Sequence, residues 1–104
     1  MRANKRRSLA AKGWAAGDAK DFLGLTKEEA AYIELRLKLA EGLKSKRQSK
    51  GVTQSQLAEA LSSSQSRVAK MEAGDPTVSL DLLVKSLLAL GTSRRQLASI
   101  IAER

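Results

Sequence analysis

The feature of this sequence that most constrains its fold is the series of helix-starting and helix-ending residues after Gly51. A Ser or Thr precedes each apolar segment, and its side-chain oxygen can accept a hydrogen bond from the first turn of a helix. Glycine or a polar turn follows these segments and would end each helix. The pattern therefore predicts four short helices after Thr53, Ser64, Ser79 and Ser93.

A longer helix is predicted before this series. Thr26 and Glu29 form a capping box, and the helix should run to about Ser49, with Gly51 as its stop. Gly42 lies inside the helix, which indicates a bend or a close packing contact. The helix carries two neighbouring apolar stripes, more than one small core requires: Tyr32, Leu35, Leu39 and Leu43 in one, and Ile33, Leu37 and Ala40 in the other. The excess indicates a second buried contact, either with a dimer partner or another protein, or with residues 13–25 folded back.

Composition favours packed helices and disfavours catalysis. Aromatic residues make up only 3% of the 104 residues, so Leu, Ile, Val and Ala must form the core, and we expect an all-α fold. The chain has no cysteine and no histidine, which removes disulfides, most zinc sites and the usual nucleophilic dyads. No convergent set of carboxylate, lysine or serine side chains stands out. We expect no enzymatic activity, metal or cofactor.

Two parts are predicted along the chain. Residues 1–25 form an extension with a basic arm followed by an apolar segment, and residues 26–104 form the folded domain. The extension should be partly ordered, because a flexible leader rarely contains the only Trp and the only Phe. The apolar residues with which the chain could bind a partner protein are Trp14, Phe22, Leu25, Ile33 and Leu37. No secretory signal or membrane span is recognisable, so we expect a cytoplasmic protein with no membrane partner.

The charge pattern and the central helix pair point to double-stranded DNA. The net charge is +8, which favours an anionic partner. Two short helices joined by a tight turn are the unit that places its second helix in the major groove. In the second helix Val68 and Met71 should face inward. The outward residues, whose side chains can bind base edges or phosphates, are then Gln65, Ser66, Arg67 and Lys70.

The same region resembles a known family. The segments GVTQSQLAEAL (51–61) and SQSRVAKMEAG (64–74), within residues 43–91, resemble the Xre/Cro-type helix-turn-helix of phage repressors. The resemblance implies a five-helix domain with Gln54 on a DNA phosphate and further backbone contacts from Thr53 and Lys50. We include Ser64, the expected helix cap, in the DNA-binding set.

The resemblance also carries structural implications. It implies an ion pair between Arg47 and Glu72, which would join two helices. The family usually has glycine, often with positive φ, at the turn position that Ser62 occupies in this sequence. Ser62 should therefore be slightly strained or shift the turn.

The leading functional hypothesis is a sequence-specific transcriptional repressor that acts as a homodimer. A second, weaker resemblance supports an alternative. Gly13-Trp and FLGLTKEE (22–29), running into this domain, are similar to compact HigA-type antitoxins. That likeness implies binding to a ribonuclease toxin and repression of the chain's own operon. An RNA-binding role ranks lower, because the chain lacks stacking aromatic residues.

Overall fold

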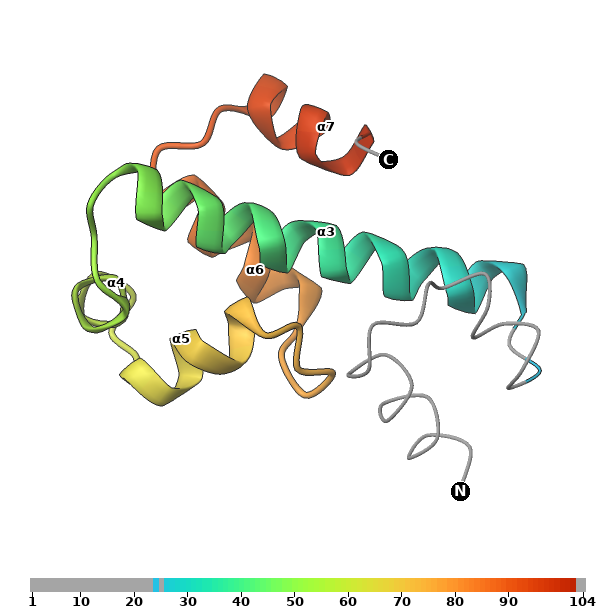
Figure 1. The fold of residues 1–104 in the computed structure, drawn as a ribbon, viewed down its shortest axis with the longest axis horizontal. Helices are drawn as coiled ribbons and strands as arrows, with labels where there is room; N and C mark the ends of the chain where they lie inside the picture. The colour runs from blue at the N-terminus through green and yellow to red at the C-terminus, as the bar shows by residue number, and fades with distance from the viewer. Residues whose placement is uncertain (1–23, 25, 103–104) are drawn as a thin grey trace. The chain divides into compact units, whose positions relative to one another are not determined.

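The computed structural model describes Gly24 and residues 26–102. By its contacts the chain divides into two compact units, residues 1–36 and 37–104. Five helices and no strand occur in the described part, which confirms the all-α expectation (Figure 1): α3 (Lys27–Ser49), α4 (Gln54–Ala60), α5 (Gln65–Glu72), α6 (Leu80–Ala89) and α7 (Arg94–Ala102). The expected partial order of the N-terminal extension concerns residues outside this range. The boundary between residues 25 and 26 stays a prediction.

The described part of the first unit is the beginning of α3. The Thr26 N–H donates to the Glu29 carboxylate, and the Glu29 N–H donates to the Thr26 hydroxyl, each at 3.0 Å. This capping box is the one that the sequence predicts. One turn later, the Arg36 guanidinium lies 5.7 Å from the centroid of the Tyr32 ring and also donates a hydrogen bond to its hydroxyl.

The second unit is built around one apolar core. Each of α3, α4, α5 and α6 contributes side chains that are at most 1% exposed: Leu39, Leu43, Leu57, Val68, Met71, Leu83 and Leu87. Burying a side chain of this size stabilises the fold by about 1.5–3 kcal/mol. In Figure 1, α5 and α7 lie on opposite sides of α3. The core holds α5 in place through Val68 and Met71, whereas the side chains on the other face of α5 are exposed.

The helix starts follow the sequence closely. At Thr53, Ser64, Ser79 and Ser93 the hydroxyl oxygen accepts a hydrogen bond from the backbone N–H three residues later. Both Thr53 and Ser93 also donate their own N–H to a glutamine side chain, which completes a capping box. The long helix ends before Gly51, whose φ of 67° lies in the left-handed region. Each observed helix begins at the residue that directly follows its expected cap.

From the spacing of apolar residues in the sequence we expect Leu88 and Ile101 to face the core, but both are exposed. Leu88 in α6 is 47% exposed and Ile101 in α7 is 48% exposed. Each follows a residue that does face inward, Leu87 or Ile100, and one helical step turns the side chain by about 100°. The apolar spacing alone made the predicted inner faces too wide.

Candidate nucleic-acid interface

The helix pair α4–α5 is joined by a short turn, residues 61–64. The backbone N–H of Ser62 donates to Glu59, and that of Ser63 donates to Ala58 at 2.8 Å. These two bonds form a Schellman motif, in which the residue at Ser62 adopts the left-handed conformation. Ser62 has a φ of 53°, the positive value implied by the family's usual glycine.

Two faces of α5 have opposite character. Val68 and Met71 are fully buried, at 0% exposure. Four side chains on the surface of α5 that faces away from the core are exposed. We call them the reading ridge: Gln65, Ser66, Arg67 and Lys70. The core thus holds one side of the helix rigidly and presents the other to a partner.

The first residue of the ridge is held by a neighbour in α4. The Gln65 side-chain amide donates to the amide oxygen of Gln54 at 2.6 Å. The Gln54 amide nitrogen donates in turn to the Glu72 carboxylate at 3.0 Å. An amide nitrogen carries two N–H groups, so Gln54 keeps one donor for a DNA phosphate. Gln54 therefore connects Gln65, the first residue of α5, to the carboxylate of Glu72, the last residue of α5.

The carboxylate of Glu72 is paired with Arg47 of α3. The guanidinium donates to both carboxylate oxygens, and one of these bonds measures 3.0 Å. It donates a further bond of 2.8 Å to the carbonyl of Val52. The two charged side chains are 12% and 3% exposed, so this bidentate pair is largely shielded from water. Arg47 and Glu72 therefore form the ion pair that the resemblance implies, and this pair links α3 to α5.

The environment of this pair shifts both ionisation equilibria. Burial by itself would raise the pKa of Glu72, but hydrogen bonds from Arg47 and Gln54, with the charges of Arg47 and Lys44, lower that pKa below its ordinary value. The hydrogen bond to Glu72 likewise raises the pKa of Arg47. Both groups are charged near neutral pH.

Comparison with known families decides how this geometry is classified. The helix-turn-helix family model matches residues 43–97, more than half of the chain. This chain belongs to the Xre/Cro-type helix-turn-helix family. Among curated proteins and among solved structures, none is significantly similar to it. Family membership assigns DNA binding and transcription regulation to the protein.

Three further residues of the expected DNA-binding set lie at helix ends and have exposed side chains. The hydroxyl oxygens of Thr53 and Ser64 accept the capping bonds of α4 and α5, and each hydroxyl can still donate. The Ser64 hydroxyl also lies 3.3 Å from that of Ser66. The ammonium group of Lys50 lies beside Gly91, in the connection between α6 and α7.

The residues predicted to bind a partner protein are only partly described. Trp14, Phe22 and Leu25 lie outside the described residues. Ile33 is half-buried on α3. Leu37 is half-buried too, and its side chain packs against Gly74 of the helix-turn-helix domain.

Sequence reasoning missed the role of Gln54 as a bridge. It assigned this residue to a phosphate alone, whereas its side chain also joins Gln65 and Glu72. These partners are 11 and 18 residues away, so no local spacing rule could have revealed the contact. Within residues 26–102 no helix is both long and apolar enough to cross a membrane. The same part of the chain contains no group of His, Cys, Asp or Glu suited to hold a metal.

Proposed function

We propose that this protein is a sequence-specific transcriptional repressor that binds double-stranded DNA as a homodimer in the cytoplasm. The observation that carries the proposal is the reading ridge, four exposed polar or basic side chains above the buried Val68 and Met71. Gln65, Ser66 and Arg67 lie in the first turn of α5, the part of a recognition helix that contacts base edges in the major groove, and Lys70 lies in its last turn. The proposal assigns binding to the chain and no enzymatic step.

The chemistry of each ridge residue suggests its task. Arg67 can donate two hydrogen bonds to guanine, and Gln65 can pair with adenine through its amide. Lys70 reaches guanine or phosphate, and Ser66 accepts or donates at either. The backbone contacts fall to the residues around the helix starts, Lys50, Thr53, Gln54 and Ser64, which would fix the register of the ridge on the duplex.

Dimerisation is proposed because one short ridge reads few base pairs. A two-fold pair would read two half-sites about one helical turn apart and add their binding energies. If the dimer neutralises about six to eight phosphates, log K should fall against log salt concentration with a slope of about −5 to −7. Repression is supported by the resemblance to phage repressors, since occupancy of a promoter is enough to exclude polymerase.

The experiment selects bound duplexes from a random DNA library and footprints the protein on the selected site. The expected site is a pseudo-palindrome with two protected half-sites, and a reporter behind it should be expressed less when the protein is present. A single protected half-site would contradict the dimer. Equal affinity for selected and random DNA would contradict sequence-specific recognition.

A second candidate, the antitoxin role, is supported by apolar side chains on α3 that the described residues do not cover. Tyr32 is 47% exposed and Ile33 is half-buried. We propose that this stretch contributes to binding a small ribonuclease toxin encoded beside the gene. The test is co-purification of the neighbouring gene product with the full chain, compared with the Tyr32→Glu variant. No co-purification would remove this role and leave repression standing.

A further inference from the structure

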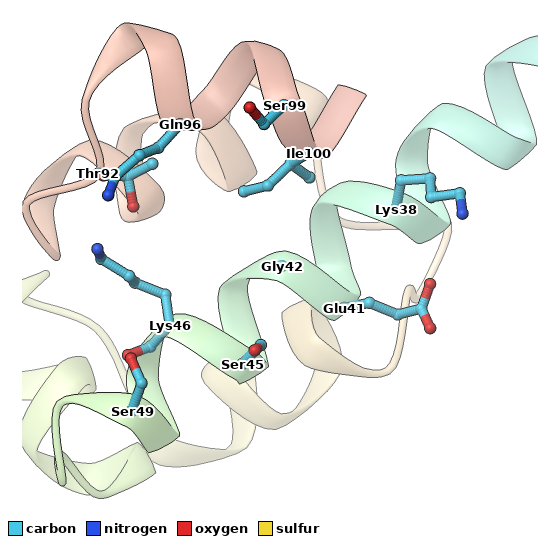
Figure 2. A pocket seen from close by; sticks show the side chains of 10 residues that line it. All are labelled: Lys38, Glu41, Gly42, Ser45, Lys46, Ser49, Thr92, Gln96, Ser99 and Ile100. Carbon is cyan, nitrogen blue, oxygen red and sulfur yellow. The ribbon is translucent and has the colours of Figure 1, made fainter. Parts of the chain in front are cut away.

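A groove of about 380 Å³ lies between α3 and α7 (Figure 2). Its volume falls within the range of small-molecule sites, about 300–1,000 Å³. Figure 1 places α7 on the side of α3 opposite α5. DNA held against the reading ridge would therefore leave this groove accessible to another ligand.

One end of the groove is positively charged. Lys46 of α3 is half-buried, and its ammonium group points across the groove toward Thr92 and Gln96 (Figure 2). The ion pairs found in the described part of the chain do not involve Lys46. The ammonium of Lys50 lies nearby, beside Gly91. The carboxylate that lines the groove, Glu41, is at its other end in Figure 2, together with Lys38.

The Gln96 side chain is fixed as a donor at the same end. Its amide oxygen accepts the Ser93 N–H at 2.9 Å in the capping box of α7. The amide nitrogen therefore remains to donate, and Gln96 lines the groove. The cap that starts α7 thus also sets the orientation of a side chain in the groove.

The third group is a hydroxyl without a partner. Thr92 lines the groove and is 4% exposed. Among the described residues, its Oγ1 is the buried side-chain oxygen or nitrogen that has no hydrogen-bond partner. An unpaired buried hydroxyl lowers stability, so an acceptor that reached it would be bound favourably. An ammonium, an amide nitrogen and a hydroxyl together present donors and positive charge.

We propose that this groove binds a small molecule through an oxyanion, a phosphate or a carboxylate group, held by Lys46, Gln96 and Thr92. The remainder of the ligand would lie along Gly42 and Ile100, which also line the groove. Because its contacts come from α3 on one side, and from α7 and the preceding Thr92 on the other, the bound ligand would hold α7 against α3. The site is separate from the reading ridge, and its occupancy is independent of the proposed repressor role.

The test uses the full chain without DNA. Its melting temperature and amide chemical shifts are recorded during titration with sodium phosphate, sodium acetate and sodium chloride at matched ionic strength. We expect saturable changes at Thr92 and Gln96 with phosphate, acetate or both, and none with chloride. A response to phosphate alone or to acetate alone identifies the oxyanion. The same response to chloride, or no saturable response, would overturn the proposal.

Variants separate binding from folding. Lys46→Gln should weaken the apparent Kd for the responding anion about tenfold, because it removes a charge-assisted hydrogen bond. Lys44→Gln, an exposed lysine on the same helix that does not line the groove, should leave the Kd unchanged. Thr92→Val keeps the side-chain shape and should melt no lower than the parent without anion, yet bind the anion more weakly. If Lys46→Gln leaves the anion titration unchanged and instead lowers affinity for all DNA, Lys46 is a DNA phosphate contact and the proposal is wrong.

Discussion

The Gln65 side chain, first residue of the reading helix, donates a hydrogen bond of 2.6 Å to the side-chain oxygen of Gln54, eleven residues earlier. Gln54 is itself bonded to Glu72, which is paired with Arg47. The start of the reading ridge is therefore positioned by a chain of polar contacts that passes through three helices. Hydrogen bonds in such a network strengthen one another, so removal of one contact should weaken the remaining ones.

We expect Gln54→Ala to weaken binding to the selected DNA site about tenfold, which is about 1.4 kcal/mol. The reason is that the Gln65 amide loses its anchor and samples other rotamers before it meets a base. Preference at the base pair that Gln65 reads should also relax. Fluorescence anisotropy with the selected site and with single-base variants measures both. Gln48→Ala, at an exposed position on α3, is the matched control. Equal losses on every sequence would show that Gln54 acts on phosphate alone.

Arg67→Ala should cost about 1–3 kcal/mol of binding free energy on the selected site and relax the preference at one base pair. Arg67 is exposed on the reading ridge, so its removal should leave the melting temperature nearly unchanged. The control is Arg95→Ala, exposed in the first turn of α7. A binding assay on single-base site variants decides the outcome. Identical losses for specific and random DNA would place Arg67 on the backbone.

The ion pair should make stability depend on pH. The pKa of Glu72 is lowered in the folded state, so its contribution to stability is complete above the ordinary pKa of the unfolded chain, about 4.5, and is lost as the pH falls through the folded value. Glu72→Gln should destabilise the protein by about 3 kcal/mol at pH 7, because Arg47 is left without its partner. The difference in unfolding free energy between parent and variant should shrink below about pH 4.5. Urea denaturation at pH 7, 5 and 3.5 measures it, and a difference that stays constant would contradict the assignment.

The parts of the fold that sequence alone predicts are those determined within one helical turn. The caps at Thr53, Ser64, Ser79 and Ser93 join residues three apart, so a residue type and a spacing are enough to place them. The buried face of α5 follows for the same reason. Val68 and Met71 are three residues apart on one side, which leaves the reading ridge on the other.

The rest depends on contacts between distant segments. The bridge through Gln54, the burial of Thr92 and the packing of Ile100 on Gly42 each require knowledge of how helices cross. Leu88 is a further example: its spacing in α6 predicts that it is buried, yet its side chain is exposed. Periodicity predicts that a face is apolar, but the width of the covered face is set by its neighbours.

Ser62→Gly should stabilise the protein by about 0.5–1 kcal/mol. At φ 53° a residue with a Cβ is destabilised by about 1–2 kcal/mol, and glycine removes this strain. The net gain is smaller, because glycine has more conformational freedom in the unfolded chain and loses more of it on folding. The expected rise in melting temperature is about 4 °C. The matched control is Ser63→Gly, whose φ is not positive, and it should lower stability by about 0.5–1 kcal/mol. A melting temperature that falls for Ser62→Gly would show that the serine hydroxyl compensates for the strain.

Gly42 allows α7 to approach α3, and this approach can be tested by a double-mutant cycle. A Cβ added at Gly42 would lie 2.9 Å from Cδ1 and 3.0 Å from Cγ2 of Ile100, so the isoleucine or the whole of α7 must move. We expect Gly42→Ala to destabilise the protein by about 1 kcal/mol, because crowding of about 1–3 kcal/mol exceeds the gain of about 1 kcal/mol in helix propensity.

In the Ile100→Ala background the crowding atoms are gone and the propensity gain remains. Gly42→Ala should then stabilise the protein by about 1 kcal/mol, so the sign of the effect reverses. Unfolding free energies of the four proteins, from urea denaturation, give a coupling of about 2 kcal/mol between the two positions, within the range of residues in contact. If Gly42→Ala has the same effect in both backgrounds, the two helices do not meet at these residues.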